Sequence, residues 1–551
     1  MLHFRPRLLD ELRGYDRDKL YGDLSAGLTV AAVALPLALA FAIASGLKPE
    51  AGLFTAIVAG FIISALGGSR VQIGGPAGAF VVVVYAIVER YGVANLLLAT
   101  MLAGALLLLM GLFRVGNLVR FVPVTIVIGF TNGIAVLIIL SQLRDFFGLP
   151  VTDLPADFFL KLRALAQAAP GADPVTIALG VASLGVIWGW PRLWRSGAGA
   201  LSRAMRHVPG TVVGLVLGTV AVAALKLHVE TIGTRFGGIP QSLPQLSWPH
   251  VGWPELSLLV GPAFTIALLG SIESLLCARV ADAVIEDRHD PNQELMAQGV
   301  ANIVAPLFGG FCATGTIART MTNVRSGAKT PVAGIVHALC LLAIVLVAAP
   351  LATHIPLATL AAVLLYVAYY MGEWHEFVRL RQFSNYYRVV MLTTFTLTVV
   401  IDLTVAVQVG LVLACLFFIA RVSGLTRVEP IRELEESSAG VDARHVEAFR
   451  ISGSLFFGAV SKMDGLLDPK RRLPRVMILD LSQLLNMDNT GLETIETLHR
   501  NLSKRGATLI LCGLQAQPKW LVAQSGLGAA LGADNVVATL SDAWRRAREL
   551  Y

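Results

Sequence analysis

Long runs without a charged residue fill most of the first 420 positions of this chain. A helix needs about 20 largely apolar residues to cross the hydrocarbon core of a membrane. Runs of suitable length lie at 24–47, 51–69, 71–88, 91–113, 121–143, 174–191, 208–225, 256–272, 295–318, 330–353, 355–372, 389–401 and 403–420. Apolar residues make up 55% of the chain and charged residues only 15%. The sequence therefore predicts a multispan α-helical membrane protein rather than a soluble one.

The run at 295–318 contains Pro306 and the pair Gly309-Gly310, and we interpret it as one helix followed by a broken segment. This gives about fourteen spans. Twenty Lys and Arg residues lie in loops on the side of the N-terminus, and seven lie in the opposite loops, namely Lys48, Arg90, Arg144, Lys161, Arg163, Lys226 and Arg235. The excess predicts that both termini are cytoplasmic in a bacterial-type inner membrane, with residues 1–23 as a cytoplasmic N-terminal segment.

Two apolar segments are interrupted by glycine pairs followed by small residues, at 71–84 and 308–320. A Gly-Gly-Pro sequence disfavours continuous helix, and backbone groups freed at membrane depth must face protein or water. Ala77 and Gly315 are 238 residues apart, while Leu37 and Glu273 are 236 apart. The nearly equal offsets predict two halves of seven spans each, and an odd number of spans makes them an inverted repeat. Chance glycine pairs would explain either break alone but not the matched offset.

If Pro76 and Thr314 begin half-helices, each presents free N–H groups and the positive end of a helix dipole at mid-membrane. Two such ends facing one another form an anion site without a fixed lysine. Thr314 and Thr316 would supply hydroxyl groups, while Gly78 and Gly315 would allow close backbone approach. We therefore predict a common mid-membrane cavity at these two breaks.

Arg319 lies little more than one helical turn beyond Thr314 and would add positive potential to this site. The alternative is an interfacial arginine whose charge reaches toward water.

Glu273 is the only acid inside the stretch 256–280. A carboxylate at membrane depth costs roughly 2.5–3.5 kcal/mol on insertion scales, so it normally faces a cavity, a partner or a substrate. The alternative is an interfacial acid near the end of a span. Beside an anion site, an ionised Glu273 would repel the substrate unless a proton or a sodium ion accompanied it. Glu273 is therefore the candidate coupling group.

These segments resemble the SulP family of sulfate permeases and related anion transporters over nearly all of the chain. The resemblance is carried by 26–53, 67–80, 270–282, 293–310 and 314–334. It implies a seven-plus-seven inverted repeat with core and gate domains, in which the transmembrane domain spans 24–421. The implied substrate-binding residues are Leu37, Phe41, Ala77, Gly78, Ala79, Thr314, Gly315 and Thr316, with Glu273 in the eighth span.

Family members known for sodium-coupled bicarbonate uptake have Asp followed four residues later by Thr in the eighth span. Glu273 and Cys277 stand at these positions here. The loss of a hard oxygen ligand counts against a sodium site and favours proton coupling.

After Arg421 the apolar runs stop, and we expect a charged linker at 422–440. Beyond it, strands are predicted at 445–458, 475–481, 507–514 and 535–540, with helices at 491–506 and 541–550. This small α/β domain at 441–551 resembles a cytoplasmic STAS domain. Thr490 stands where anti-sigma-factor antagonists carry a phosphorylated Ser or Thr, although a simple helix cap is the alternative.

The leading hypothesis is a proton-coupled symporter for a small inorganic or carboxylate anion. An anion exchanger, an uncoupled channel and sodium-coupled symport are the alternatives. Sulfate, bicarbonate, chloride and C4-dicarboxylates all suit such a site, with a slight preference for sulfate or a dicarboxylate. We expect a homodimer. We find no catalytic dyad, nucleotide motif, metal-ligand spacing or nucleic-acid stripe, and predict no enzyme activity, cofactor, metal or nucleic-acid partner.

Overall fold

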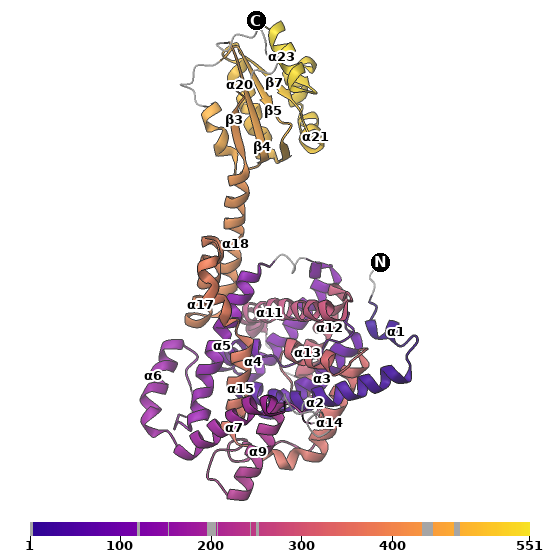
Figure 1. Cartoon of the computed structure of the whole chain (residues 1–551), viewed down its shortest axis with the longest axis vertical. Coiled ribbons are helices and arrows are strands. Elements are labelled where there is room, and N and C mark those ends of the chain that lie inside the picture. Colours follow the sequence, from indigo (N-terminus) through magenta and orange to yellow (C-terminus); the bar gives the residue numbers. More distant parts are fainter. Residues whose placement is uncertain are drawn as a thin grey trace. The chain divides into compact units, whose positions relative to one another are not determined.

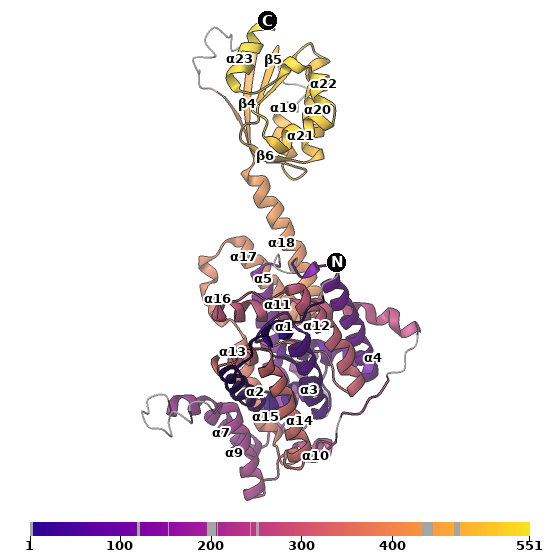
Figure 2. The same ribbon diagram turned by 90° about the vertical axis from the view of Figure 1, so that its right-hand side faces the viewer.

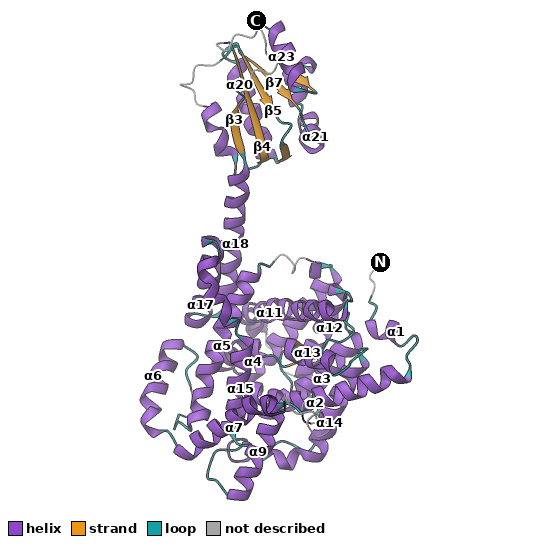
Figure 3. Cartoon of the chain, in the orientation of Figure 1, coloured by secondary structure: helices purple, strands orange, loops and turns teal. Residues whose placement is uncertain are grey.

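The structure of the chain, a computed structural model, describes residues 4–117, 122–151, 154–194, 205, 208–242, 244–248, 253–431, 445–467 and 474–550. It divides into two compact units, residues 1–411 and 412–551. Figure 3 shows that the first unit is almost entirely helical and that the longer strands belong to the second.

The first half of the helical unit begins with a short helix and continues through long ones (Figure 1). Its elements are α1 (Arg7–Glu11), α2 (Arg17–Ala44), α3 (Pro49–Leu66), β1 (Gly74–Gly75), α4 (Gly78–Leu112), α5 (Val124–Phe147), α6 (Phe158–Ala168), α7 (Pro174–Leu193), α9 (Gly210–Leu225) and α10 (Ile232–Phe236). α4 consists of two helices joined at Gly92, whose φ of 82° lies in the region that favours glycine. α2 begins at Arg17, where the Asp16 side chain caps it, so the last residues of the predicted segment 1–23 are already helical.

The second half repeats this series. Its elements are α11 (Trp253–Ile285), α12 (Pro291–Val304), β2 (Thr314–Gly315), α13 (Ile317–Arg325), α14 (Val332–Ala352), α15 (Leu357–Met371), α16 (Trp374–Val378), α17 (Asn385–Val400) and α18 (Leu403–Leu425). If α4 counts as two, seven helices of the first half (α2 to α9, without α6) match α11 to α18, without α16. Among the described residues, eight helices are long and apolar enough to cross a membrane, or nine if the bent pair Leu357–Met371 and Trp374–Gln382 is one span. The others are shorter.

The packing shows the inverted repeat directly. α2 packs on α14, and its counterpart α11 packs on α4; α3 packs on α14, and its counterpart α12 packs on α4. In the same way, α5 packs on α17 while α15 packs on α7. The helices thus form a core group (α2 to α4 and α11 to α14) and a gate group (α5, α7, α9, α15, α17 and α18). This is the predicted seven-plus-seven architecture.

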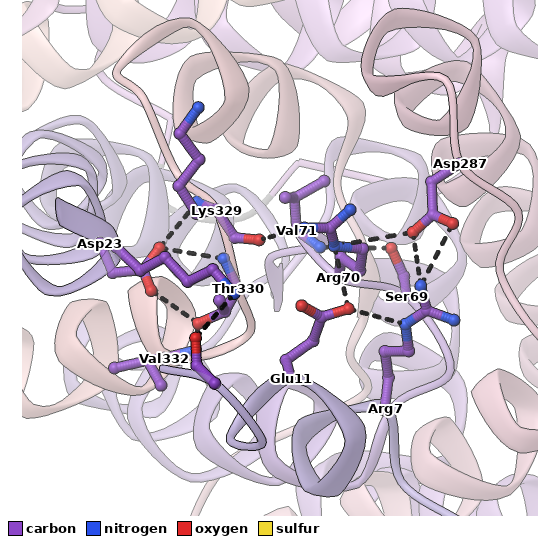
Figure 4. A network of polar contacts seen from close by, with 12 residues as sticks. Arg7, Glu11, Asp23, Ser69, Arg70, Val71, Asp287, Lys329, Thr330 and Val332 are labelled. Carbon is purple, nitrogen blue, oxygen red and sulfur yellow. Dashed lines mark hydrogen bonds and ion pairs between the residues drawn. The ribbon is translucent and has the colours of Figure 1, made fainter. Parts of the chain in front are cut away.

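The N-terminal segment is fastened to both halves by a polar network (Figure 4). Arg7 and Arg70 share Glu11 and Asp287 as ion-pair partners, with Arg7 Nη2 at 2.9 Å from Asp287 and Arg70 Nε at 3.1 Å from Glu11. Glu11 precedes α2, Arg70 follows α3, and Asp287 follows α11. The network therefore ties α1 to loops of the first and the second half.

Asp23 forms a second bridge from α2 to the loop between α13 and α14. Its buried carboxylate accepts hydrogen bonds from the backbone N–H groups of Lys329 and Thr330, at 2.7 and 3.0 Å, and from the Thr330 hydroxyl. The Tyr15 hydroxyl also donates to it, and burial together with the Asp23 charge raises the pKa of Tyr15 to about 12.

The second unit is an α/β domain around a six-stranded sheet. Its strands are β3 (Arg427–Pro430), β4 (Val446–Leu455), β5 (Val476–Asp480), β6 (Leu484–Met487), β7 (Thr508–Cys512) and β8 (Val536–Val537), in the order β3-β4-β5-β7-β8 with β6 paired to β4. Its helices are α19 (Asp464–Leu467), α20 (Asn489–Ser503), α21 (Ala516–Gln524), α22 (Leu527–Leu531) and α23 (Leu540–Glu549). Met477 and Leu479 pack toward α20, while Val476 and Ile478 pack toward α23 on the other face. Figure 2 shows the two helical layers on either side of the sheet.

One partly buried ion pair lies at the end of β5. Asp480 accepts hydrogen bonds from Arg450 Nε at 2.7 Å and from the Ser482 backbone at 3.0 Å. Burial raises the pKa of Asp480, but the bonds from Ser482 and Arg450 outweigh it and hold the pKa below its usual value.

Two expectations for the tail need correction. The expected linker 422–440 begins with the last turn of α18 and with β3, because residues 427–430 pair antiparallel with β4; residues 432–440 lie outside the described part. Asp488, whose side chain accepts from the Gly491 N–H, caps α20. Thr490 is therefore not the cap but an exposed residue in the first turn.

Candidate anion site

The two interrupted segments meet inside the core group as a short antiparallel ladder. Gly74 pairs with Gly315 and Gly75 with Thr314, and the ladder continues where the Thr316 N–H donates to the Ile73 carbonyl at 3.0 Å. Because the paired strands run in opposite directions, α4 and α13 leave this crossing in opposite directions and begin next to it. The two breaks, 238 residues apart in the chain, therefore adjoin one another as predicted.

The glycines are required here by close approach. A Cβ on Gly315 would lie 1.5 Å from Gln72 Nε2, and a Cβ on Gly74 would lie 2.2 Å from Ile63 Cδ1. The side chains of Gln72 and Ile63 thus occupy the space that a larger residue would need.

Buried side chains satisfy the extended backbone that leads into each half-helix. The Thr320 hydroxyl accepts from the Ile73 N–H at 3.0 Å, and Asn302 pairs with both backbone groups of Ala313, at 2.8 and 2.9 Å. The N–H and C=O groups of this irregular backbone are therefore hydrogen-bonded to protein groups, which is necessary in a membrane interior because no water is available there.

The half-helices start slightly later than predicted. α4 begins at Gly78 and α13 at Ile317, rather than at Pro76 and Thr314. The strand pairing keeps Gly75 and Thr314 extended, so helix can form only beyond the ladder. Neither helix start has a side-chain cap. In α4 the Phe80 N–H donates to the Ala77 carbonyl at 3.1 Å, so the N–H groups of Gly78 and Ala79, together with those of the first turn of α13, are the ones available to a ligand.

Several predicted site residues surround the start of α4. Ala77 is its N-cap, and Gly78 and Ala79 open its first turn; all three are buried. Phe41 of α2 lies against Gly78, since a Cβ on Gly78 would be 3.3 Å from Phe41 Cε1. Leu37 lies one turn earlier on α2 and is buried.

The threonine hydroxyls have partners within the protein. Thr314 Oγ1 donates to the Gly270 carbonyl at 2.9 Å, and Thr316 Oγ1 donates to the Ile73 carbonyl at 3.2 Å. Thr314 is fully buried, and Thr316 is half-buried. In this conformation, the donors free to bind an anion are backbone N–H groups rather than these hydroxyls.

Glu273 lies on the side of α11 that packs against the crossing. One turn before it, Gly270 accepts the bond from Thr314; one turn after it, Cys277 Sγ lies 3.2 Å from Thr320 Oγ1. Glu273 is half-buried, and its carboxylate has no hydrogen bond or ion pair within the described residues. A free carboxylate thus lies on the helix that borders both half-helices.

Arg319, in the first turn of α13, is fully buried, and all three of its guanidinium nitrogens lack a hydrogen-bond partner in the described structure. It packs beside β1, where a Cβ on Gly75 would lie 2.4 Å from Nη1. The burial of Arg319 rules out the alternative of an interfacial arginine whose charged group extends into water. A buried guanidinium without a counter-ion creates a strong positive potential.

His337 of α14 is a neighbour that the sequence analysis did not identify. It is fully buried near Arg319, and neither of its ring nitrogens has a partner in the described part of the chain. Gly60 of α3 borders the ring, because a Cβ there would lie 3.9 Å from Nε2. The only sequence signal was a single histidine within the apolar run 330–353.

Comparisons with known proteins agree with this architecture. The model of the sulfate permease family matches residues 20–394, and that of the STAS domain matches 442–543. YvdB of Bacillus subtilis, whose name assigns it to sulfate transport, is 39% identical over 95% of this chain and 96% of its own. The bicarbonate transporter BicA of Picosynechococcus is 31% identical over 79% of each chain.

Solved structures share the fold. The transmembrane domain of a cyanobacterial bicarbonate transporter BicA matches 71% of this chain and 97% of its own, at 32% identity and a TM-score of 0.64. Murine solute carrier 26 family member A9, an anion transporter in the inward-facing state, matches 99% of this chain and 94% of its own, at 18% identity and a TM-score of 0.86. On this evidence the chain belongs to the sulfate permease family and ends in a STAS domain.

Proposed function

We propose that this protein is a secondary active transporter that moves a small anion through the β1–β2 crossing by alternating access. The observation that carries the proposal is the convergence of two uncapped helix starts and the unpaired Arg319 at one buried position. Free N–H groups, two helix dipoles and a guanidinium all favour a negative ligand.

Glu273 is the proposed coupling group. Its free carboxylate on α11 would repel an anion at the crossing, and a bound proton removes that charge. Proton and anion would therefore bind together, which is symport. An exchanger, an uncoupled channel or sodium-coupled symport would not need this protonation.

The proposed substrates are sulfate, bicarbonate or a C4-dicarboxylate. YvdB is named for sulfate transport and BicA for bicarbonate transport, which supports the first two. The residues nearest the start of α4 are small (Ala77, Gly78 and Ala79), which leaves room for an anion larger than a halide. We also propose an inner-membrane homodimer with both termini in the cytoplasm, on the basis of the loop charges and the family resemblance.

Uptake into proteoliposomes tests the proposal. Labelled sulfate, bicarbonate, succinate and chloride are offered with and without an inward proton gradient, in sodium-free buffer. We expect accumulation of one of these anions, driven by the gradient. In Glu273→Gln the gradient no longer drives uptake, whereas the exposed Glu286→Gln behaves like the wild type. Uptake indifferent to the gradient, with Glu273→Gln fully active, would exclude proton symport; uptake only in exchange for internal anion would support the exchanger.

A further inference from the structure

A cavity of about 530 Å³ lies between the core and gate groups, away from the N-terminal network. Its walls come from α2, α4 and α11 on the core side, and from α5, α6 and the junction of α17 with α18 on the gate side. Its charged lining residues are Arg90, Arg144, Asp145, Asp157, Lys161 and Asp402. Under the orientation proposed above, this is the outer side of the membrane.

Lys161 is the unusual residue in this lining. Its side chain is 94% buried, since only 6% of the residue is exposed, yet Nζ has no hydrogen bond or carboxylate within ion-pair distance among the described residues. The ammonium lies 5.3 Å from the centre of the Tyr85 ring. Burial lowers the pKa of Lys161, an effect that nearby Glu89 and Asp157 oppose. A nearby anion would compensate this desolvation.

The acids around the cavity are already engaged. Asp145 pairs with Arg235 at 2.8 Å and with Arg144 at 3.0 Å. Asp157 and Asp402 accept from backbone N–H groups at the starts of α6 and α18, at 2.9 and 2.8 Å.

Two exposed charges remain beside the cavity. Glu89 is exposed and accepts from the Ala156 N–H at 3.2 Å. Arg90 is exposed, with its guanidinium 5.4 Å from the centre of the Tyr91 ring. Lys161 is therefore the buried charge of this lining without an ion pair among the described residues, and Arg90 is an exposed positive charge of the same lining.

The cavity leads toward the crossing along α4. Val81, three residues after Gly78, already lines it, and Tyr85 lies beneath Lys161. At 1.5 Å per residue, Tyr85 is about 10 Å along the helix from its start. Thr265 of α11, which also lines the cavity, lies about two turns before Glu273.

We propose that this cavity is an outer anion-binding site in which Lys161 holds a small inorganic or carboxylate anion before it reaches the β1–β2 crossing. The inference rests on the proposed anion transport and adds a second, separate binding position. Because Lys161 attracts the anion but does not take part in the translocation step, it should govern the concentration needed for uptake rather than the maximal rate.

Uptake kinetics of the full chain test this, using the anion that the wild type accumulates. At low ionic strength we expect Lys161→Met to raise KM about five- to tenfold with an unchanged maximal rate, and high salt to reduce the difference. Lys161→Arg keeps the charge and should keep KM near the wild-type value. Glu89→Gln removes an opposing charge and should lower KM. The control is Lys48→Met, an exposed lysine at the start of α3 that does not line the cavity.

The outcomes separate the two proposals. If the wild type takes up none of the anions, the transport proposal fails and the outer site fails with it. If the wild type transports but Lys161→Met matches Lys48→Met, or changes only the maximal rate, then the outer site is wrong and the transport proposal stands. If Lys161→Met does not fold, Glu89→Gln and Lys161→Arg decide: an unchanged KM in Glu89→Gln overturns the proposal.

Discussion

Replacing Gly315 by Ala should damage the crossing because its Cβ has no space. The added Cβ would lie 1.5 Å from Gln72 Nε2, whereas such contacts do not come below about 3.0 Å. The amide must retreat by about 1.5 Å, which breaks its bonds to the Ser274 carbonyl (3.2 Å) and hydroxyl (3.1 Å). Losing two net hydrogen bonds and leaving a buried donor unsatisfied costs about 2–4 kcal/mol of unfolding free energy.

The assay is unfolding of the purified protein in mixed micelles, together with uptake into proteoliposomes. Gly185→Ala is the control, because a Cβ at Gly185 of α7 meets nothing within 4 Å and should stabilise slightly. Gln72→Ala removes the obstacle, so adding Gly315→Ala to it should cost little more. Two outcomes would show that the close approach of Gly315 to Gln72 does not constrain the crossing. One is that the stability losses of Gln72→Ala and Gly315→Ala add fully in the double variant, and the other is that Gly315→Ala is as stable and active as the wild type.

Three further predictions concern charge and domain organisation. Arg319→Met should abolish anion-dependent thermal stabilisation, because the guanidinium is buried without a counter-ion, whereas the exposed Arg325→Met should retain it; equal stabilisation of both variants would contradict an electrostatic role. The pKa of Asp480 is lower in the folded protein than the value of about 4 expected in the unfolded chain. Its pair with Arg450 therefore stabilises the second unit fully at pH values above about 4, and this contribution is lost as the pH falls through the lower, folded-state pKa. Hydrogen exchange in β5, corrected for intrinsic pH effects, should show this acid loss, and Asp480→Asn should remove the pH dependence; identical profiles would refute it. Truncation after residue 425 should preserve anion binding but change transport rate or expression, because Glu273 and every candidate substrate-binding residue precede the STAS domain; loss of binding by a folded truncated protein would show that the tail shapes the site.

Features set by local composition were predictable from the sequence. Apolar runs identified the spans because membrane insertion depends on summed hydrophobicity over about 20 residues. The glycine pairs and their equal offset located both breaks, since few other residues permit such close approach. The strand and helix periodicity of the tail likewise predicted β5, β7 and α20 closely.

Features set by distant contacts were not predictable in this way. The start of α13 depends on the pairing of Thr314 with Gly75, and β3 depends on its pairing with β4. The direction of the Arg319 side chain and its proximity to His337 depend on packing among α3, α13 and α14. The roles of the predicted site residues, Glu273 among them, remain predictions until the transport experiments are done.

The polar network of Figure 4 also constrains the order of events during synthesis. Arg7 and its partner Asp287 are 280 residues apart, so the ribosome needs roughly 15–60 s to make the second after the first. Until then α1 has no complete docking site, and β1 has no partner strand. The first half must therefore remain in the membrane with β1 unpaired until the second half has been made. The N-terminal helix α1 is synthesised first, but it is among the last elements to adopt its native contacts.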